Sequence, residues 1–386
     1  MRYYIIAGEA SGDLHGSNLI RSLVRYDSKA VVRYWGGDLM DAACRETNID
    51  ATRSMHISQL AYMGFVEVAL HARTIMHNMK FCRHDLIEFH PDAVIYVDYP
   101  GFNLKIAAFA HRKGMRNYHY ISPNLWAWKK GRIRKMRRIL DKLFCILPFE
   151  QQFYAENNMP QALYVGHPLL DAVASFRRQE PDETAPTTDR IVALLPGSRR
   201  QELKKMLPTM ARLARRYPDY QFEVAGMSLL GRQLYDDLLC ECPDNITVVY
   251  DQTYALLARS RSAIVCSGTA TLETALFNVP QVVCYRANAI TIAIARMLVS
   301  SRIRFISLVN LIANRHVVTE LIQSDMTDAA LFANFEAITF DGENREKILK
   351  GYDEVRTLLG GGGASDRVVQ TIVDELNNQT VASVAQ

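Results

Sequence analysis

The stretch IVALLPGSRRQE, residues 191–202, decides the fold because it repeats in mid-chain the order of elements found at the N-terminus. Residues 3–8, YYIIAG, form an apolar run that ends at a glycine, and a helical pattern begins near Leu14. Both stretches predict a strand, a glycine turn and a helix, the repeating unit of a parallel sheet covered by helices. Because this unit starts twice, the sequence predicts an α/β protein with two doubly wound domains in tandem.

Other apolar runs extend both sheets, and 386 residues are enough for two domains. The further candidate strands are residues 92–98, 117–122, 142–148, 222–226, 246–250, 262–268 and 281–285. We expect a first domain at residues 1–168, a second at 169–345 and a C-terminal helical segment at 346–386. Loops at the carboxyl ends of the two sheets are expected to face each other across an interdomain cleft.

Composition and charge exclude several classes of protein. Hydrophobic residues make up 49% of the chain, and the net charge of +4 argues against a nucleic-acid-binding protein, which usually has a basic domain. The seven cysteines show no zinc-ligand spacing, which predicts free thiols in a reducing compartment and no metal site. The chain has no apolar run of about 18 residues and no signal-peptide pattern. We therefore expect a cytoplasmic protein without a nucleic-acid partner.

The first candidate site is AGEASGDLHG, residues 7–16, where the first strand passes into the first helix. It is not a P-loop, because no Gly-Lys-Ser/Thr follows, and its glycine spacing is not GxGxxG. A glycine turn at a helix N-terminus still suits a polar ligand, which Glu9, Ser11 and His15 would contact. The alternative is a tight turn in which Asp13 caps the helix.

The second candidate is Asp98 in VIYVDYPGFN, residues 94–103, because it ends a strand and is followed by Pro100 and Gly101. A carboxylate at the carboxyl end of a parallel strand points into the crevice where such folds bind ligands. It suits a general base that activates a hydroxyl group. The alternative is an ordinary turn or helix cap, since Asp is common before Pro and Gly in turns.

The third candidate is LLPGSRRQE, residues 194–202, in which Ser198 and Arg199 lie in a loop that enters a helix. Backbone amides, a hydroxyl and a guanidinium together suit a phosphate or pyrophosphate group. The alternative is a charged loop that is simply solvated.

The fourth candidate is CSGTATLETAL, residues 266–276, where a strand ends and the turn Ser267-Gly268-Thr269 leads into a helix. The loop and the helix N-terminus suit a pyrophosphate. Glu273, one turn into the helix, is placed to bond a ribose diol. The alternative is a capping box that uses Glu273 for its own helix.

A basic segment forms the last candidate, SPNLWAWKKGRIRKMRRI, residues 122–139. Eight residues from Lys129 to Lys142 are basic, and at helical spacing they lie opposite an apolar stripe. Basic helices with aromatic anchors bind anionic membrane surfaces, whereas a solvated charged face is the alternative. The residues assigned to membrane or phosphate docking are Trp126, Trp128, Lys129, Lys130, Arg134 and Arg138.

Eight short motifs occur in an order that resembles one enzyme family. They are GEASGD, MGFVEV, DYPGFN, ISPNLWAW, LPFE, VGHPLLD, LLPGSR and SGTATLE. Together they resemble lipid-A-disaccharide synthases, glycosyltransferase family 19. The resemblance implies a GT-B fold of two Rossmann-like domains and an inverting transfer from UDP-2,3-diacylglucosamine to 2,3-diacylglucosamine 1-phosphate. It implies no metal or other cofactor, and a peripheral place on the inner face of the cytoplasmic membrane. It also implies that residues 346–386 pack back on the first domain or are exchanged between the subunits of a homodimer.

The resemblance also implies roles for individual residues. Asp98 resembles the general base on the acceptor 6-hydroxyl, and Glu9, Ser11 and His15 belong to the loop on the acceptor side. The residues that resemble donor ligands are Ser198, Arg199, Ser267, Gly268, Thr269, Glu273 and Asn310. Many members have Asp-Ala-Pro-Asp-Phe-Asn where this chain has DYPGFN, so Gly101 replaces a second acid. The alternative enzymes are other GT-B members, such as a UDP-N-acetylglucosamine 2-epimerase or a peptidoglycan glycosyltransferase.

Overall fold

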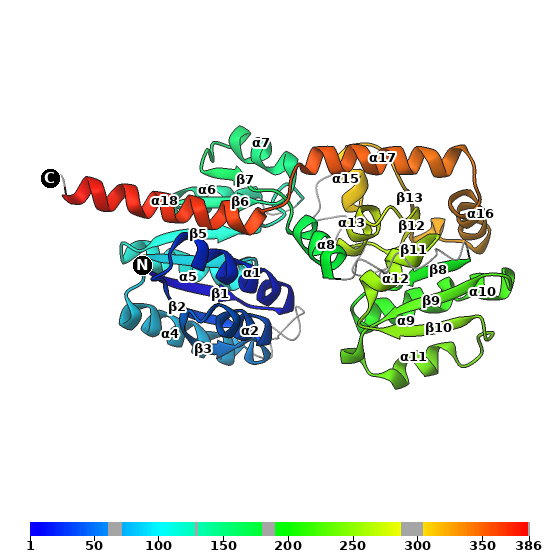
Figure 1. Cartoon of the computed structure of the whole chain (residues 1–386), viewed down its shortest axis with the longest axis horizontal. Coiled ribbons are helices and arrows are strands. Elements are labelled where there is room, and N and C mark those ends of the chain that lie inside the picture. The colour runs from blue at the N-terminus through cyan, green and yellow to red at the C-terminus, as the bar shows by residue number, and fades with distance from the viewer. Residues whose placement is uncertain (61–71, 128–129, 180–189, 287–303, 385–386) are drawn as a thin grey trace. The chain divides into compact units, whose positions relative to one another are not determined.

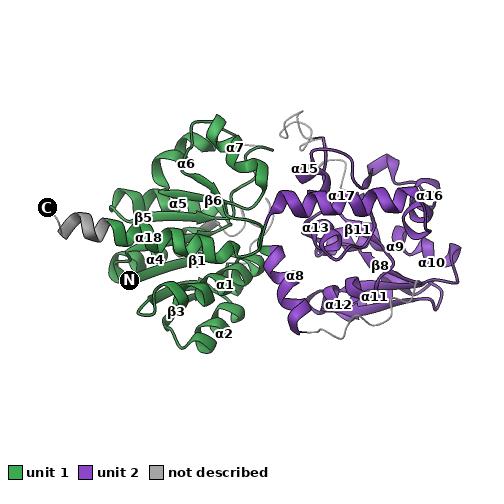
Figure 2. Cartoon of the chain, turned by 45° about the horizontal axis from the view of Figure 1, so that its top comes forward, with its two compact units in different colours: residues 1–168, 361–386 green, residues 169–360 purple. Residues whose placement is uncertain are grey.

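The computed structural model describes residues 1–60, 72–127, 130–179, 190–286 and 304–384 (Figure 1). The chain divides into two compact units (Figure 2). Unit 1 comprises Met1–Pro168 and Gly361–Gln386, and unit 2 comprises Leu169–Gly360. The expected boundary between residues 345 and 346 falls inside a continuous helix of unit 2, α17 (Glu343–Leu359), so that boundary was wrong.

Unit 1 is built on a seven-stranded sheet with the order β3-β2-β1-β4-β5-β6-β7. All neighbouring pairs are parallel, and the strand order reverses at β1. This is the doubly wound arrangement in which ligands bind where the order reverses. The strands are β1 (Arg2–Ala7), β2 (Val31–Gly36), β3 (Asp50–His56), β4 (Ala93–Val97), β5 (Arg116–Tyr120), β6 (Lys142–Cys145) and β7 (Ala162–Tyr164).

Helices cover both faces of the first sheet because successive strand residues point to opposite sides. Tyr4 and Ile6 pack with one group of helices, whereas Tyr3, Ile5 and Ala7 pack with the other. The first group is α4 (Ala72–Phe89), α5 (Pro100–Arg112), α6 (Ile133–Ile139) and α7 (Pro148–Glu156). The second group is α1 (Ala10–Tyr26), α2 (Asp38–Thr47) and α18 (Ala364–Val384).

The C-terminal helix α18 packs on unit 1, beside α1 (Figure 1). Val368, Val369 and Ile372 contribute to the core of that unit. Asp366 accepts hydrogen bonds from Ser22 and from Arg25 of α1. Within one chain, therefore, the last helix completes the sheet-covering layer of the first unit.

Unit 2 repeats the topology with a six-stranded parallel sheet of order β10-β9-β8-β11-β12-β13, and its order reverses at β8. The strands are β8 (Ile191–Leu195), β9 (Gln221–Gly226), β10 (Ile246–Tyr250), β11 (Ser262–Cys266), β12 (Gln281–Tyr285) and β13 (Thr319–Ile322). Its helices include α8 (Pro168–Gln179), α9 (Arg200–Met210), α10 (Arg212–Arg216), α11 (Arg232–Leu239), α12 (Thr253–Arg259), α13 (Thr269–Leu276), α15 (Leu308–Ala313) and α16 (Asp328–Thr339). Two α/β units in tandem confirm the expected fold class.

Every candidate strand from the sequence coincides with a strand of the structure, but four strands were missed. β3 (DATRSMH) is an edge strand with few buried residues, and β7 and β13 have only three and four residues. Such strands lack the apolar run that marks a buried parallel strand. The fourth, β2, carries Arg33 in the middle of its apolar run.

Candidate functional site

The candidate residues gather at the carboxyl ends of the strands where each sheet reverses its order. In unit 1 these strands are β1 and β4, which are followed by Glu9 and Asp98. In unit 2 they are β8 and β11, which are followed by the loops 196–199 and 267–268. Both sites therefore occupy the crevice that this topology provides for ligands.

Asp98 lies in a strained stretch of backbone. Asp98 and Tyr99 both have left-handed conformations, with φ of 46° and 49°, and Ile121 after the neighbouring strand β5 has φ of 67°. Asn103 donates to the carbonyl oxygen of Asp98 at 2.7 Å, and Asp98 itself donates from its amide to the carbonyl of Tyr120 at 2.9 Å. Left-handed residues other than glycine cost free energy and cluster at functional sites.

Burial, and after it the nearby carboxylate of Glu9, together raise the pKa of Asp98 to about 6. Glu9 precedes α1 as its N-cap residue, so two carboxyl groups meet where β1 and β4 diverge. A carboxylate with a pKa near 6 remains ionised at neutral pH and accepts a proton more readily than an ordinary Asp. This side chain can therefore serve as a general base.

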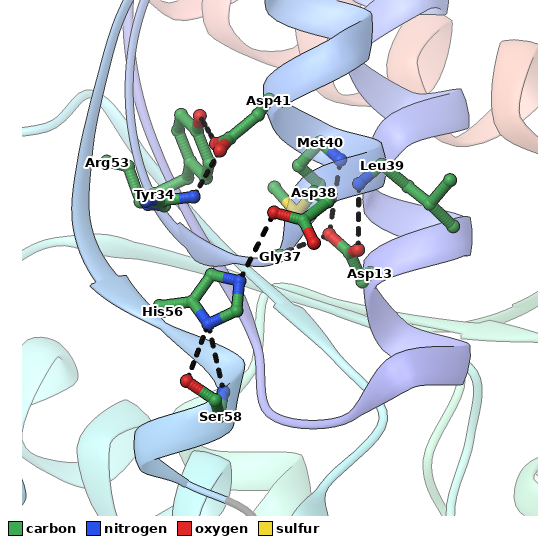
Figure 3. Close-up of polar contacts among 10 residues, drawn as sticks. All are labelled: Asp13, Tyr34, Gly37, Asp38, Leu39, Met40, Asp41, Arg53, His56 and Ser58. Atoms are coloured by element: carbon green, nitrogen blue, oxygen red, sulfur yellow. Dashed lines mark hydrogen bonds and ion pairs between the residues drawn. The ribbon is translucent and has the colours of Figure 1, made fainter. Parts of the chain in front are cut away.

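Asp13 caps a different helix from the one expected. It lies in the first turn of α1, yet its carboxylate accepts from the amides of Gly37 at 2.6 Å, Leu39 at 3.0 Å and Met40 at 3.2 Å (Figure 3). These amides belong to the N-terminus of α2, which a carboxylate stabilises. The alternative in which Asp13 caps α1 was therefore wrong, because its carboxylate binds the N-terminus of α2 instead.

The two other residues expected in the acceptor-side loop differ in their surroundings. Ser11 is exposed in the first turn of α1. Burial lowers the pKa of His15 to about 4, and its ring lies edge-on to Tyr120 with a centroid distance of 6.2 Å. His167 is buried, and burial together with His15 lowers its pKa to about 3. Both histidines are therefore neutral at pH 7 and would act as hydrogen-bonding groups, not as cations.

Unit 2 contains a pocket of about 390 Å³, a volume typical of small-molecule sites. It brings together six of the seven residues assigned to the donor. Positive φ angles at Gly197 and Gly268, 105° and 157°, shape its two loops. The lining residues are Leu195, Gly197, Ser198, Arg199, Glu202, Ala225, Met227, Thr253, Cys266, Ser267, Gly268, Thr269, Ala270 and Glu273.

The pocket combines an exposed cation, Arg199, with the N-termini of two helices. The Arg199 side chain is 71% exposed and contacts the Glu202 carboxylate only at 3.4 Å, so the guanidinium can reorient toward a ligand. α9 and α13 both begin at the pocket, and the first amides of a helix lack partners within it. Such amides and an Arg suit a phosphate or diphosphate.

Glu273 has a role other than capping its own helix. Its Oε1 accepts a hydrogen bond from the Tyr254 hydroxyl at 2.8 Å, and burial raises its pKa. α13 has no side-chain cap at its N-terminus, so the capping-box alternative was wrong. Tyr254 was missed by sequence reasoning, because it comes from α12 and no spacing pattern links it to Glu273.

Asn310 does not line the pocket, unlike the other residues assigned to the donor. It is fully buried, and its side-chain amide donates to the carbonyl of Val318 and to Glu320, both at 2.9 Å. Its oxygen accepts from the amides of Val317 at 2.7 Å and Val318 at 3.0 Å. These bonds fasten α15 to the chain entering β13, and ligand binding by Asn310 stays a prediction.

The basic segment folds differently from the continuous helix that was expected. A 3-10 turn at Lys130–Arg132 leads into α6, which ends at Ile139, and its apolar side is buried in the core of unit 1. That side cannot enter a membrane, whereas Arg134 and Arg138 are exposed. Trp126 is half-buried and donates to Glu150 at 3.3 Å, and Trp128 and Lys129 lie outside the described residues.

The described ranges contain neither a candidate membrane span nor a candidate metal site. None of the helices in these ranges is both long and apolar enough to span a bilayer. The same ranges contain no group of three or more His, Cys, Asp or Glu residues arranged to hold a metal ion.

Known proteins match both the sequence and the fold. A family model described as lipid-A-disaccharide synthetase matches residues 3–365. The lipid-A-disaccharide synthase of Geobacter sulfurreducens is 35% identical over 385 residues, which is 98% of each chain. A UDP-GlcNAc 2-epimerase from Neisseria meningitidis bound to UDP-GlcNAc has a TM-score of 0.67 at 14% identity, covering 97% of this chain and 100% of that one. The glycotransferase of kitacinnamycin has a TM-score of 0.66 at 16% identity, covering 97% and 99%.

The structural likeness, at such low identity, shows the fold alone, and that fold is GT-B. The sequence matches extend over nearly the whole chain and carry the assignment further. The chain belongs to the lipid-A-disaccharide synthase family and is a glycosyltransferase of lipid A biosynthesis.

Proposed function

We propose that this enzyme joins UDP-2,3-diacylglucosamine to 2,3-diacylglucosamine 1-phosphate, giving the β-1,6-linked disaccharide 1-phosphate and UDP. The name of its relatives, lipid-A-disaccharide synthase, supports the disaccharide product. The division of chemistry between the two units supports the mechanism. Unit 1 offers a carboxylate whose pKa lies close to neutral, and unit 2 offers a pocket suited to a nucleotide diphosphate.

The acceptor half of the proposed reaction depends on Asp98. Its carboxylate takes the proton of the acceptor 6-hydroxyl while that oxygen attacks the anomeric carbon of the donor. Because the attack comes from the face opposite the leaving group, the anomeric configuration inverts. The raised pKa, due first to burial and then to Glu9, favours this proton transfer.

The donor half depends on unit 2. As the bond between the anomeric carbon and the phosphate oxygen breaks, UDP leaves with the electron pair and gains negative charge. The Arg199 guanidinium and the first amides of α13 would stabilise that charge, and Glu273 would bond the ribose. No metal ion or other cofactor is needed in this proposal. The proposed reaction requires that the groups of both units act on one pair of substrates.

The observation that carries the proposal is Asp98, a half-buried carboxyl on strained backbone with a pKa near 6 at the reversal point of the first sheet. The test is a transfer assay in mild detergent with both lipid substrates, following disaccharide and UDP in wild type and Asp98→Ala. We expect product from the wild type and a loss of about 10²–10⁴-fold in the variant, the usual size of general-base catalysis. Equal product from both proteins would show that Asp98 is not the general base. No product from the folded wild type would refute the proposed reaction and direct screening to other UDP-sugars.

We also propose that unit 1 docks on the anionic inner face of the cytoplasmic membrane through the exposed basic side of α5 and α6. The pKa of Lys135 is lowered by burial and by the charges of Lys105, Arg132 and Arg112, which shows that cations crowd this surface. Docking would rest on charge, because the apolar side of α6 is in the core. Each such cation near the lipid surface is worth about 1 kcal/mol.

Liposome flotation tests the docking surface. The variant combines Lys130→Glu, Arg134→Glu and Arg138→Glu, and the control changes Lys29→Glu and Lys204→Glu, two exposed lysines elsewhere. We expect wild type and control to float with vesicles containing anionic lipid and to be released by salt. The variant should stay in solution. Equal flotation of all three proteins would refute the assignment.

A homodimer that exchanges C-terminal segments remains a further proposal. α18 lies on unit 1 through contacts that a second copy could equally supply, among them the bonds of Asp366 to Ser22 and Arg25. Sedimentation over a range of concentrations would detect the dimer. Loss of the dimer on truncation at Gly361 would support exchange.

A further inference from the structure

The aromatic ring of Tyr99 occupies the crevice between β1 and β4. A Cβ atom added to Gly8 would lie 2.6 Å from Cγ and 2.9 Å from Cε1 of the Tyr99 ring. Gly8 is the residue that joins β1 to the N-cap of α1, and Tyr99 is the residue that joins Asp98 to α5. The ring therefore lies directly on the backbone at the point where this fold places its ligand.

The ring is held in this place before any ligand arrives. Tyr99 has the left-handed conformation, and its ring stacks on Phe102 with a centroid distance of 5.8 Å and an interplanar angle of 28°. Phe102 belongs to the core of unit 1, and Asn103 fixes the preceding carbonyl. A ring immobilised in this way loses little further freedom when it binds a ligand.

Tyr99 is half-buried and directly follows Asp98 in the chain. Burial raises its pKa, and Glu9 raises it further, so Glu9 is close to the ring as well as to Asp98. A flat apolar surface bordered by two carboxylates suits one chemical class in particular. A hexose ring presents an apolar C–H face to an aromatic ring and hydroxyl donors to carboxylates at its edge.

We propose that Tyr99 is the platform for the acceptor sugar and holds its glucosamine ring so that the 6-hydroxyl meets Asp98. The inference rests on the proposed function, since the acceptor is the one named there. A purely structural role for the ring, as a cover for Gly8, is the competing account.

Steady-state kinetics on Tyr99→Ala, Tyr99→Leu and Tyr99→Phe separate the two accounts. We expect Tyr99→Ala to raise the KM for the acceptor about tenfold, the size of one aromatic contact, and to leave the KM for the UDP donor within about twofold. Tyr99→Leu keeps bulk without a flat face and should behave like Tyr99→Ala. Tyr99→Phe should resemble wild type. A structural role predicts a lower Tm with no selective rise in the acceptor KM.

Gly8 provides an independent test that keeps Tyr99 intact. Gly8→Ala must displace the ring, so it should raise the acceptor KM in the wild-type background. In the Tyr99→Ala background the added methyl group meets no ring, and its effect should largely vanish, because the two sites act as one unit. Gly101→Ala is the matched control, since a Cβ there would have nothing within 4 Å.

The outcomes distinguish this inference from the proposed function. Disaccharide from the wild type, with an unchanged acceptor KM in Tyr99→Ala, would overturn the platform alone. Equal harm from Gly8→Ala in both backgrounds would also overturn it. A wild type that folds but forms no disaccharide would overturn the proposed function and this inference with it.

Discussion

The two reversal points of this enzyme share a topology and differ in almost all of their chemistry. In unit 1 the loops after β1 and β4 carry two carboxyl groups, Glu9 and Asp98, on backbone that is left-handed at Asp98 and Tyr99. In unit 2 the equivalent loops carry Arg199 and obtain their positive φ angles from Gly197 and Gly268. One site can take a proton, and the other can neutralise an anion.

The difference teaches that topology places a site but does not choose its reaction. Glycine at the turns of unit 2 leaves backbone amides accessible, which suits phosphate oxygens. Side chains at the turns of unit 1 cover the backbone, and Tyr99 lies directly over Gly8. Two carboxylates at that point would repel a diphosphate, so the donor cannot bind there as it would in unit 2.

Among the tests of this contrast between the two units, we expect the largest effect from Arg199→Ala, which should weaken donor binding. A charge-assisted hydrogen bond is worth about 1.5–3 kcal/mol, so we expect UDP affinity to fall about 10–100-fold. Arg200→Ala is the matched control, because Arg200 is exposed and bonds the carbonyl of Leu230 instead. Calorimetric titration of UDP into both variants makes the measurement. Equal affinity for UDP in Arg199→Ala and wild type would break the assignment of unit 2.

Much of this arrangement could be predicted from the sequence, because local patterns encode it. The apolar runs that end at Ala7, Val97, Leu195 and Cys266 gave the strands that flank both reversal points. Asp98 and Arg199 were predicted as site residues because each follows the end of a candidate strand.

Other features depend on contacts between distant segments and could not be predicted. Asp13 caps α2, 24 residues away at Gly37, and Tyr254 reaches Glu273 from α12. Asn310 was assigned to donor binding from its motif. In the structure, its side-chain amide makes hydrogen bonds to residues 317–320 of the same unit. The apolar stripe of α6 was read correctly as amphipathic, but periodicity cannot tell whether such a stripe faces a core or a lipid.

A smaller effect concerns the charge of Glu9. Its carboxylate raises the pKa of Asp98, after the larger contribution of burial, because a second negative charge disfavours ionisation. Glu9→Gln removes that charge, so the pKa of Asp98 should fall and the acid limb of kcat/KM should move to lower pH. At acid pH the rate should rise at most about tenfold, the equivalent of one pKa unit.

The pH profile of kcat/KM measures this directly, since its acid limb reports the free enzyme. Glu88→Gln is the control, an exposed glutamate of the same unit that lies 3.7 Å from Arg33. The affinity for UDP should not change in either variant. If the acid limb of kcat/KM lies at the same pH in Glu9→Gln as in the wild type, or shifts in both variants, the charge of Glu9 does not set the pKa of Asp98.

The smallest expected effect is on stability, and it follows from the same raised pKa. Asp98 has a folded-state pKa of about 6 against an ordinary value of 3.8. Between these values the folded protein binds more protons than the unfolded chain, so its stability falls as pH rises through the window and is constant above it. Asp98→Asn lacks this titration, and its stability relative to wild type should therefore be greater at pH 7.5 than at pH 4.5.

We expect this gain to be on the order of 1 kcal/mol, or about 2–4 °C in Tm for a unit of this size. Differential scanning calorimetry of both proteins at the two pH values isolates it, because strain and packing at position 98 contribute equally at each pH. A variant that gains stability at high pH while losing transfer would show that unit 1 keeps a destabilising charge for its reaction. An equal Tm difference at both values would mean that burial of Asp98 costs nothing, and the general base would then need another source of its basicity.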